Sequence, residues 1–193
     1  MIRLLMARHG ESEWQVRGEV AGSDSPLTAL GRRQAERLGR WLAAKQGVDR
    51  IYASPLERAR VTAELVAAHV GLPVHFHDDL AEAWFLVASE LPVFGSPLSI
   101  LDSQLVGAQE GGEDYLLFRA RVERALREIL SAPPEGTTLI VAHGGTIETI
   151  FRLLLESDNF SVNLGNATLH SLVWYEQHWC IEFVDRWEHL RGL

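Results

Sequence analysis

Hydrophobic positions along the chain follow two patterns, continuous apolar runs and runs in which apolar residues recur at helical spacing. Short apolar runs bounded by glycine, proline or polar residues are typical of strands buried on both faces. These runs predict strands at 2–8, 50–53, 73–77, 138–142, 168–175 and 179–187. The helical spacing predicts helices at about 28–45, 54–71, 114–131 and 146–155.

Strands that alternate with helices indicate an α/β fold, a three-layer α/β/α sandwich with a mostly parallel central sheet. The length of 193 residues suits a single domain, 1–193, with a sizeable core. Two stretches carry no regular pattern. Residues 11–27 are expected to form an irregular arm, and about 83–112 a variable cap or insert. An irregular segment as long as the second is usually functional or contains short helices.

Short polar signals mark the ends of the predicted helices. Thr28 and Asp114 are suited to N-cap positions, and Gly71 to a helix C-terminus. Ser54, Pro55 and Glu57 together resemble a capping box, with Ser54 as the N-cap and proline at the first helical position. Capping alone explains Thr28, Ser54 and Glu57, so we expect structural roles for them.

The composition limits the classes of partner and the compartment. The formal net charge of −8 disfavours a nucleic-acid or anionic-membrane surface, so an anionic substrate requires a local basic pocket. Cys180 is the single cysteine, which excludes an internal disulfide and fits a reducing compartment. No signal-peptide pattern and no apolar run of membrane length occur. We therefore expect a cytoplasmic protein.

Ionisable residues follow the carboxyl ends of three predicted strands. Arg8 and His9 follow the first, Ser54 and Arg58 the second, and His143 the strand at 138–142. Ligands of open α/β sheets bind beyond these strand ends, so the side chains should converge at one edge. Arginine forks and helix N-termini suit a phosphoryl group. A histidine beside that group can attack phosphorus, and a carboxylic acid is then needed to protonate the leaving alcohol.

Several motifs in a fixed order strengthen this interpretation. They are Arg8-His9-Gly10-Glu11-Ser12-Glu13-Trp14, Asp24-Ser25-Pro26-Leu27-Thr28 with Gly31 and Gln34-Ala35, Ser54-Pro55-Leu56-Glu57-Arg58-Ala59 with Thr62-Ala63, Leu80-Ala81-Glu82, and His143-Gly144-Gly145, with Asn166 at a later matching position. Together they resemble branch 1 of the histidine phosphatase superfamily, which includes cofactor-dependent phosphoglycerate mutase. The resemblance covers residues 2 to about 155 and implies a phosphoglycerate mutase-like fold.

The resemblance also implies roles for individual residues. His9 would be the phosphorylated nucleophile, and Arg8, Arg58 and His143 would hold the phosphoryl oxygens and the charge of the transition state. Glu82 would be the general acid and then the base that activates water. Its rivals for that role are the acidic residues of the following segment, which are Glu90, Glu110 and Glu113.

Three further contacts to the substrate are implied, from Ser12, Gln15 and the backbone N–H of Gly144. The family often has asparagine where this chain has Gln15, which is expected to reshape one phosphate contact. The family also continues after the acid with glycine and a Trp-Glu-Gly-like stretch. The sequence here is Ala83-Trp84-Phe85-Leu86-Val87, so no particular substrate carries over.

No metal and no cofactor are expected. His75 and His77 share a strand face, but no third ligand occurs at an informative spacing, and we expect exposed polar side chains. The expected partner is a small phosphorylated substrate, without nucleic acid or membrane. The apolar residues of 83–112 indicate either a less polar leaving group or a subunit interface, such as that of a homodimer.

Three functions remain open at this point. A phosphatase would transfer the phosphoryl group from His9 to water, and a phosphoglycerate mutase-type enzyme would return it to another hydroxyl. A catalytically silent binding protein on the same fold is the third. Mutases of the family tend to be longer and to keep the pattern after the acid that is missing here. The sequence therefore favours a phosphatase, a phosphoric monoester hydrolase of the histidine acid phosphatase type.

Overall fold

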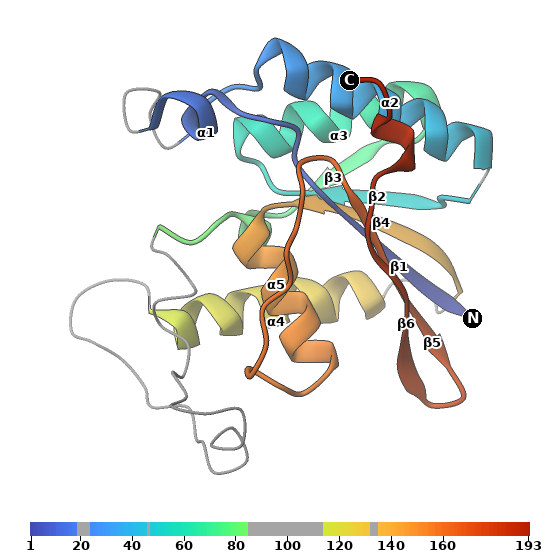
Figure 1. The fold of residues 1–193 in the computed structure, drawn as a ribbon. Coiled ribbons are helices and arrows are strands. Elements are labelled where there is room, and N and C mark those ends of the chain that lie inside the picture. Colours follow the sequence, from blue (N-terminus) through green and yellow to red (C-terminus); the bar gives the residue numbers. More distant parts are fainter. Residues whose placement is uncertain (19–23, 46, 85–113, 132–134) are drawn as a thin grey trace.

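A single six-stranded sheet forms the centre of the molecule (Figure 1). The computed structural model describes residues 1–18, 24–45, 47–84, 114–131 and 135–193. The strands are β1 (Ile2–Arg8), β2 (Arg50–Ala53), β3 (Val74–Phe76), β4 (Gly136–Ala142), β5 (Leu169–Tyr175) and β6 (His178–Arg186), in the spatial order β3-β2-β4-β1-β5-β6. Strands β1 to β4 run parallel, while β5 is antiparallel to β1 and β6 to β5. The expected mostly parallel sheet is confirmed.

Helices cover both faces of this sheet. They are α1 (Glu13–Arg17), α2 (Ala29–Lys45), α3 (Glu57–Val70), α4 (Tyr115–Ser131) and α5 (Gly144–Leu154), with short 3₁₀ helices η2 (Asp78–Leu80) and η5 (Glu188–Leu190). Figure 1 shows α2 and α3 on one face and α4 and α5 on the other. The expected α/β class and three-layer arrangement are therefore confirmed.

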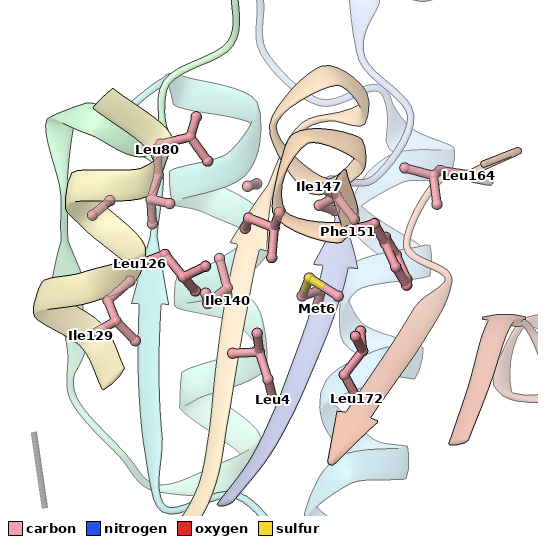
Figure 2. Close-up of a cluster of buried hydrophobic side chains, with 14 of the residues drawn as sticks. Leu4, Met6, Leu80, Leu126, Ile129, Ile140, Ile147, Phe151, Leu164 and Leu172 are labelled. Atoms are coloured by element: carbon pink, nitrogen blue, oxygen red, sulfur yellow. The ribbon is translucent and has the colours of Figure 1, made fainter. Parts of the chain in front are cut away.

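The buried strands place alternate apolar side chains on opposite faces of the sheet. Leu4 and Met6 of β1 belong to the core under α4 and α5, which Figure 2 shows in close-up. Leu5 and Ala7 belong to the second core, under α2 and α3. Burying one large aliphatic side chain contributes about 1.5–3 kcal/mol, so both faces hold β1 in place. The residues at the carboxyl end of β1 therefore start from a fixed backbone.

Several predicted element ends agree with the structure. The Thr28 hydroxyl accepts a hydrogen bond from Gly31 N at 3.0 Å, and an Asp114 oxygen accepts one from Leu117 N at 2.8 Å. Gly71 closes α3 with a φ of +79°. The β5–β6 hairpin turns through Glu176 and Gln177, whose positive φ values of 47° and 68° suit a tight two-residue turn.

Two local predictions are wrong. The arm at 11–27 contains helix α1, which Ser12 and Gln15 cap in a capping box. The sequence of the arm shows no helical spacing of apolar residues, so this helix was not predicted. Helix α3 begins at Glu57 with Leu56 at the N-cap, not at Ser54. The N–H of Glu57 donates instead to Asp24 Oδ1 at 2.6 Å. A cap supplied by a residue so distant in the sequence leaves no local signal.

The insert predicted at 83–112 lies almost wholly outside the described residues, and the single-domain boundaries with this insert stay a prediction. In the described part of the chain, no helix is both long and apolar enough to span a membrane.

Candidate active site

The carboxyl ends of β1, β2 and β4 lie side by side at one edge of the sheet, as the strand order requires. A cavity of about 620 Å³ opens there. The predicted site residues that line it are Arg8, His9, Ser12, Gln15, Arg58, Glu82 and Gly144. His143 lies within the protein beside His9 and is fully buried, with the two ring centroids 5.2 Å apart. The structure thus brings together all the residues to which the family resemblance assigned a role in the site.

His9 is buried and its ring is held in one tautomer. Its Nδ1 lies 2.7 Å from the carbonyl oxygen of Gly10, and because a carbonyl only accepts, Nδ1 carries the hydrogen. Nε2 of the neutral ring then has a lone pair, towards which Arg58 Nε donates at 3.2 Å. Burial lowers the pKa of His9 to about 3, aided by the charges of Arg58 and Arg8 and opposed by the Gly10 bond. The ring is therefore neutral at physiological pH, which is the form that a histidine nucleophile requires.

The backbone turn at Gly10, directly after His9, packs closely against the start of α2. A Cβ on Gly10 would lie 2.4 Å from the Gly31 carbonyl oxygen, and one on Gly31 would lie 2.0 Å from the Glu11 carbonyl oxygen. Such contacts leave room only for glycine at both positions. The N–H of Gly10 also donates to the Thr62 hydroxyl of α3 at 3.1 Å. Both helices on this face therefore fix the backbone next to the nucleophile.

Arg8 is oriented by the loop that precedes β5. Its Nη1 donates to the Leu164 carbonyl oxygen at 2.7 Å. The Ala167 N–H returns a bond to the Arg8 carbonyl oxygen at 3.0 Å, and Asn166 Nδ2 donates to the His9 carbonyl oxygen at 3.1 Å. The buried Nε of Arg8 has no hydrogen-bond partner in the described part of the protein. That N–H is available to a substrate oxygen.

His143 follows β4 and serves as the N-cap residue of α5. Its Nε2 lies 2.7 Å from the Ser54 hydroxyl, which fixes the ring plane. Burial, followed by the effects of His9 and the two arginines, holds the pKa of His143 well below its ordinary value. Its Nδ1 is buried and has no partner among the described residues. This nitrogen is the second unused group of the site.

Glu82 closes the site from the segment after η2. Its Oε2 accepts from Gly145 N and its Oε1 from Ala83 N, both at 3.1 Å. Burial raises the pKa of Glu82 above its ordinary value, although these two bonds and the charges of Arg58 and Arg8 oppose the shift. A raised pKa suits a general acid. The rivals Glu90, Glu110 and Glu113 lie outside the described residues.

Ser12, Gln15 and Gly144 complete the rim. Ser12 is buried, whereas the exposed Gln15 exchanges amide hydrogen bonds of 3.1 and 2.9 Å with Asn166. Helix α5 begins at Gly144, so its first backbone N–H groups have no intrahelical acceptor. Such N–H groups carry partial positive charge, which favours an anion bound at the helix start.

His75 and His77, for which no metal was expected, each contact a residue of another kind. His75 is exposed with its ring against Tyr52, and His77 Nε2 lies 3.0 Å from Glu128 Oε2. Over the residues that the structure describes, no group of three or more His, Cys, Asp and Glu side chains could hold a metal ion.

A family model described as histidine phosphatase superfamily (branch 1) matches residues 4–186. The chain belongs to the histidine phosphatase superfamily. Among the relatives of this histidine phosphatase is the uncharacterized phosphatase PhoE of Bacillus subtilis, 30% identical over 195 residues, which cover 100% of this chain and 98% of the relative. The probable phosphoglycerate mutase GpmB of Salmonella paratyphi B is 28% identical over 190 residues, 93% of this chain and 88% of the relative.

Solved structures of similar proteins share the fold of this histidine phosphatase. The phosphoserine phosphatase of Entamoeba histolytica in complex with 3-phosphoglyceric acid has a TM-score of 0.76 and 25% identity, covering 98% of this chain and 100% of that one. The mycobacterial glucosyl-3-phosphoglycerate phosphatase with VO₃ has a TM-score of 0.72 and 25% identity, with coverages of 95% and 99%. The expected family is confirmed, and the relatives named as phosphatases support the expected enzyme class, phosphoric monoester hydrolase.

Sequence reasoning missed two supports of the histidine phosphatase site. Ser54 was assigned to capping, but its hydroxyl orients His143. Asp185 of β6 accepts from Gly165 N at 2.9 Å and from the Thr168 hydroxyl at 2.7 Å, and so anchors the loop that holds Arg8. The positive φ of 53° at Asp185 is the structural mark of this role.

Proposed function

We propose that this protein hydrolyses a small-molecule phosphomonoester by way of a phosphohistidine at Nε2 of His9. The observation that carries the proposal is the fixed, neutral tautomer of His9. Its Nδ1 is committed to the Gly10 carbonyl, so the lone pair is on Nε2, next to Arg58, and His9 lines one cavity with Arg8, Arg58 and Glu82. A nucleophile, two cations and a proton donor thus surround the position of one phosphoryl group.

In the first step the substrate phosphate lies between Arg8 and Arg58. Nε2 of His9 attacks phosphorus, the new P–N bond forms as the P–O bond to the alcohol breaks, and protonated Glu82 donates its proton to the leaving oxygen. The unused Nε–H of Arg8 and the backbone N–H of Gly144 stabilise the equatorial oxygens as charge moves. His143 Nδ1 is placed to contribute one more contact.

In the second step water replaces the departed alcohol. The Glu82 carboxylate takes a proton from water, the water oxygen attacks phosphorus, and the P–N bond breaks to release inorganic phosphate. His9 returns to its neutral form and Glu82 to its protonated form, so the cycle closes. The same arginine pocket serves both in-line transfers.

Transfer to water, and not to a second hydroxyl, is favoured by the relatives named as phosphatases and by the departure after Glu82 at Ala83 and Trp84. Inorganic phosphate release from a panel of phosphomonoesters tests this assignment. Conversion of 3-phosphoglycerate to its 2-phosphate isomer without phosphate release would establish the mutase instead. Binding of vanadate without release from any ester would establish the silent protein.

Turnover is expected to be independent of divalent metal ions. The described residues provide no cluster of metal-binding side chains, while Arg8 and Arg58 supply positive charge to the phosphoryl oxygens. Treatment with EDTA followed by gel filtration should leave kcat within about twofold of the untreated value. A loss of activity that added Mg²⁺, Mn²⁺ or Zn²⁺ restores would contradict the arginine-only mechanism.

Replacement of Glu82 by glutamine is expected to slow alkyl phosphates far more than activated aryl phosphates. Glutamine keeps an oxygen for the N–H groups of Ala83 and Gly145 but cannot donate a proton to the leaving group. General acid catalysis typically contributes about 10²–10⁴-fold, and a good leaving group needs little of it. The measurement is kcat for propyl phosphate and for 4-nitrophenyl phosphate in both proteins.

The matched control for this experiment is Glu176→Gln, a substitution at the exposed β5–β6 turn that should change neither rate. Equal losses on both substrates in Glu82→Gln would assign the acid to another residue, with Glu110 and Glu113 next to be tested.

A further inference from the structure

We infer that the site rejects substrates whose leaving alcohol carries a second anionic group and accepts those whose alcohol is uncharged and apolar or aromatic. This inference rests on the proposed function, because it concerns the alcohol that leaves when His9 is phosphorylated. It follows from the charged residues that line the cavity and from the lack of lysine, arginine and histidine in the segments outside the described ranges.

The cavity holds enough positive charge for one phosphoryl group and no excess. Among the described residues that line it, the cations are Arg8 and Arg58, whose two charges match a phosphomonoester dianion. Glu82 must be protonated to act as an acid, so it adds no charge in the first step. Arg121 lies behind the site, where its Nη1 donates to the carbonyl oxygens of Asp79 and Ala81 at 2.9 and 2.7 Å.

The segments outside the described ranges cannot change this count. Residues 19–23, 46, 85–113 and 132–134 contain no lysine, arginine or histidine. The segment 85–113, which follows the acid in sequence, instead contains four acidic residues, which are Glu90, Asp102, Glu110 and Glu113. Wherever these residues lie, they bring no cation to a carboxylate or second phosphate of the substrate.

Glu148 of α5 places a carboxylate on the cavity wall, where it forms an ion pair with Arg152. Its Oε1 accepts from Val162 N at 2.7 Å and its Oε2 from the buried Arg152 at 3.3 Å, so the carboxylate is held in place. It lies close enough to Arg8 to act on its pKa. A second anion on the leaving alcohol would enter a cavity in which, among the described wall residues, this carboxylate is the one charged group without a role in the first step. Like charges at such range disfavour binding and transition state alike.

The uncharged part of the described wall combines the polar side chains of Ser12, Gln15 and Asn163 with a larger apolar and aromatic surface. Leu56 and Val162 line the cavity, together with Trp14 and Trp84, which are 52% and 74% exposed. Indole faces of this kind bury an apolar or aromatic alcohol favourably. The two observations agree, because the described wall offers contact to carbon and, beyond Arg8 and Arg58, no cation to a second anion.

The experiment compares matched pairs of esters on the full chain. The first pair is 4-carboxyphenyl phosphate and its methyl ester, 4-(methoxycarbonyl)phenyl phosphate. The second is O-phosphoserine and O-phosphoethanolamine, which differ by one carboxylate. We expect kcat/KM to be at least about tenfold higher for the member without the carboxylate in both pairs. A ratio below about fivefold in either pair would overturn the inference.

Two variants test the origin of the discrimination through the same ratio. Trp14→Arg places a cation at the exposed rim, and Glu148→Gln removes the wall carboxylate with little change in shape. Each should lower the preference against the carboxylate at least fivefold. An unchanged ratio in Trp14→Arg would contradict the inference even if Glu148→Gln fails to fold, because Trp14 lies on the surface of a short helix.

Failure of this inference and failure of the proposed function give different results. Cleavage of both members of a pair at equal rates, with a phosphoenzyme on His9, would remove the specificity and leave the phosphatase. Absence of phosphate release from all four esters would contradict the phosphatase itself.

Discussion

Replacing His9 by alanine is expected to lower kcat by at least about four orders of magnitude and to remove the covalent intermediate, because no other side chain can take its place. The nearest imidazole is His143, whose Nε2 is held by the Ser54 hydroxyl and whose ring is fully buried. Uncatalysed hydrolysis of phosphomonoesters is among the slowest reactions known, with enzymatic accelerations of up to about 10²¹. Loss of the nucleophile should therefore leave no measurable turnover.

The fold and the oxyanion site should survive this change. The backbone of His9 is held by its N–H bond to the Ala142 carbonyl oxygen at 2.9 Å and by the Gly10–Gly31 contact, neither of which needs the imidazole. Arg8 and Arg58 keep their charges. Vanadate or phosphate should still bind to His9→Ala, which separates a lost nucleophile from a lost site.

The measurement is rapid quench with a ³²P-labelled ester, followed by treatment of the trapped protein with acid and with base. A phosphohistidine releases its label in mild acid and retains it in base. His178→Ala, at the exposed β5–β6 turn, is the matched control and should label like the parent protein. A label that resists mild acid, or that still forms in His9→Ala, would exclude His9 as the phosphoryl carrier.

The central part of the site was predictable because its signals are local. Arg8, His9 and His143 each follow a long apolar run, and parallel strands bring their carboxyl ends to one edge whatever the details of packing. The positions of β1 and β4 as neighbours then place the two histidines side by side. Arg58 was identifiable because a cation in the first turn of a helix opposes the helix dipole.

The supporting contacts were not predictable because they join residues remote in sequence. Asp24 caps α3 from the arm before α2, while the Ser54 hydroxyl contacts His143. Asp185 anchors a loop from the neighbouring strand β6. Each of these residue types also suits an ordinary turn or cap, so its functional contact appears only in three dimensions.

Acidification is expected to destabilise the protein strongly between about pH 6.5 and pH 4. Burial lowers the pKa of His9 to about 3 and that of His170 to about 4, and it lowers the pKa of His143 and His189 as well. In the unfolded chain these histidines return to ordinary values near 6.5. Below pH 6.5 the unfolded chain therefore binds protons that the folded protein does not bind. The free energy of unfolding is highest above pH 6.5 and falls as the pH decreases.

The size of this effect follows from the linkage. A histidine whose folded pKa lies below 5, as for His9 and His170, costs about 1.4 kcal/mol per pH unit below 6.5, or about 2 kcal/mol at pH 5. Glu82 opposes the trend, because its raised pKa lets the folded state bind a proton before the unfolded chain does. His9 and His170, whose pKa values fall to about 3 and about 4, together account for a loss of about 4 kcal/mol in the free energy of unfolding between pH 7.5 and pH 5, a large fraction of the typical 5–15 kcal/mol.

Urea unfolding at several pH values in phosphate-free buffer measures this loss directly. His170→Asn gives the decisive comparison, because the asparagine oxygen can accept the Asp185 N–H that His170 Nδ1 accepts at 3.0 Å, yet it does not titrate. Its free energy of unfolding should fall less steeply, by about 1.4 kcal/mol per pH unit between pH 6.5 and 5. A free energy of unfolding that stays level or rises as the parent protein is taken to pH 5 would mean that its buried histidines accept protons in the folded state. The neutral His9 on which nucleophilic attack depends would then be lost at that pH.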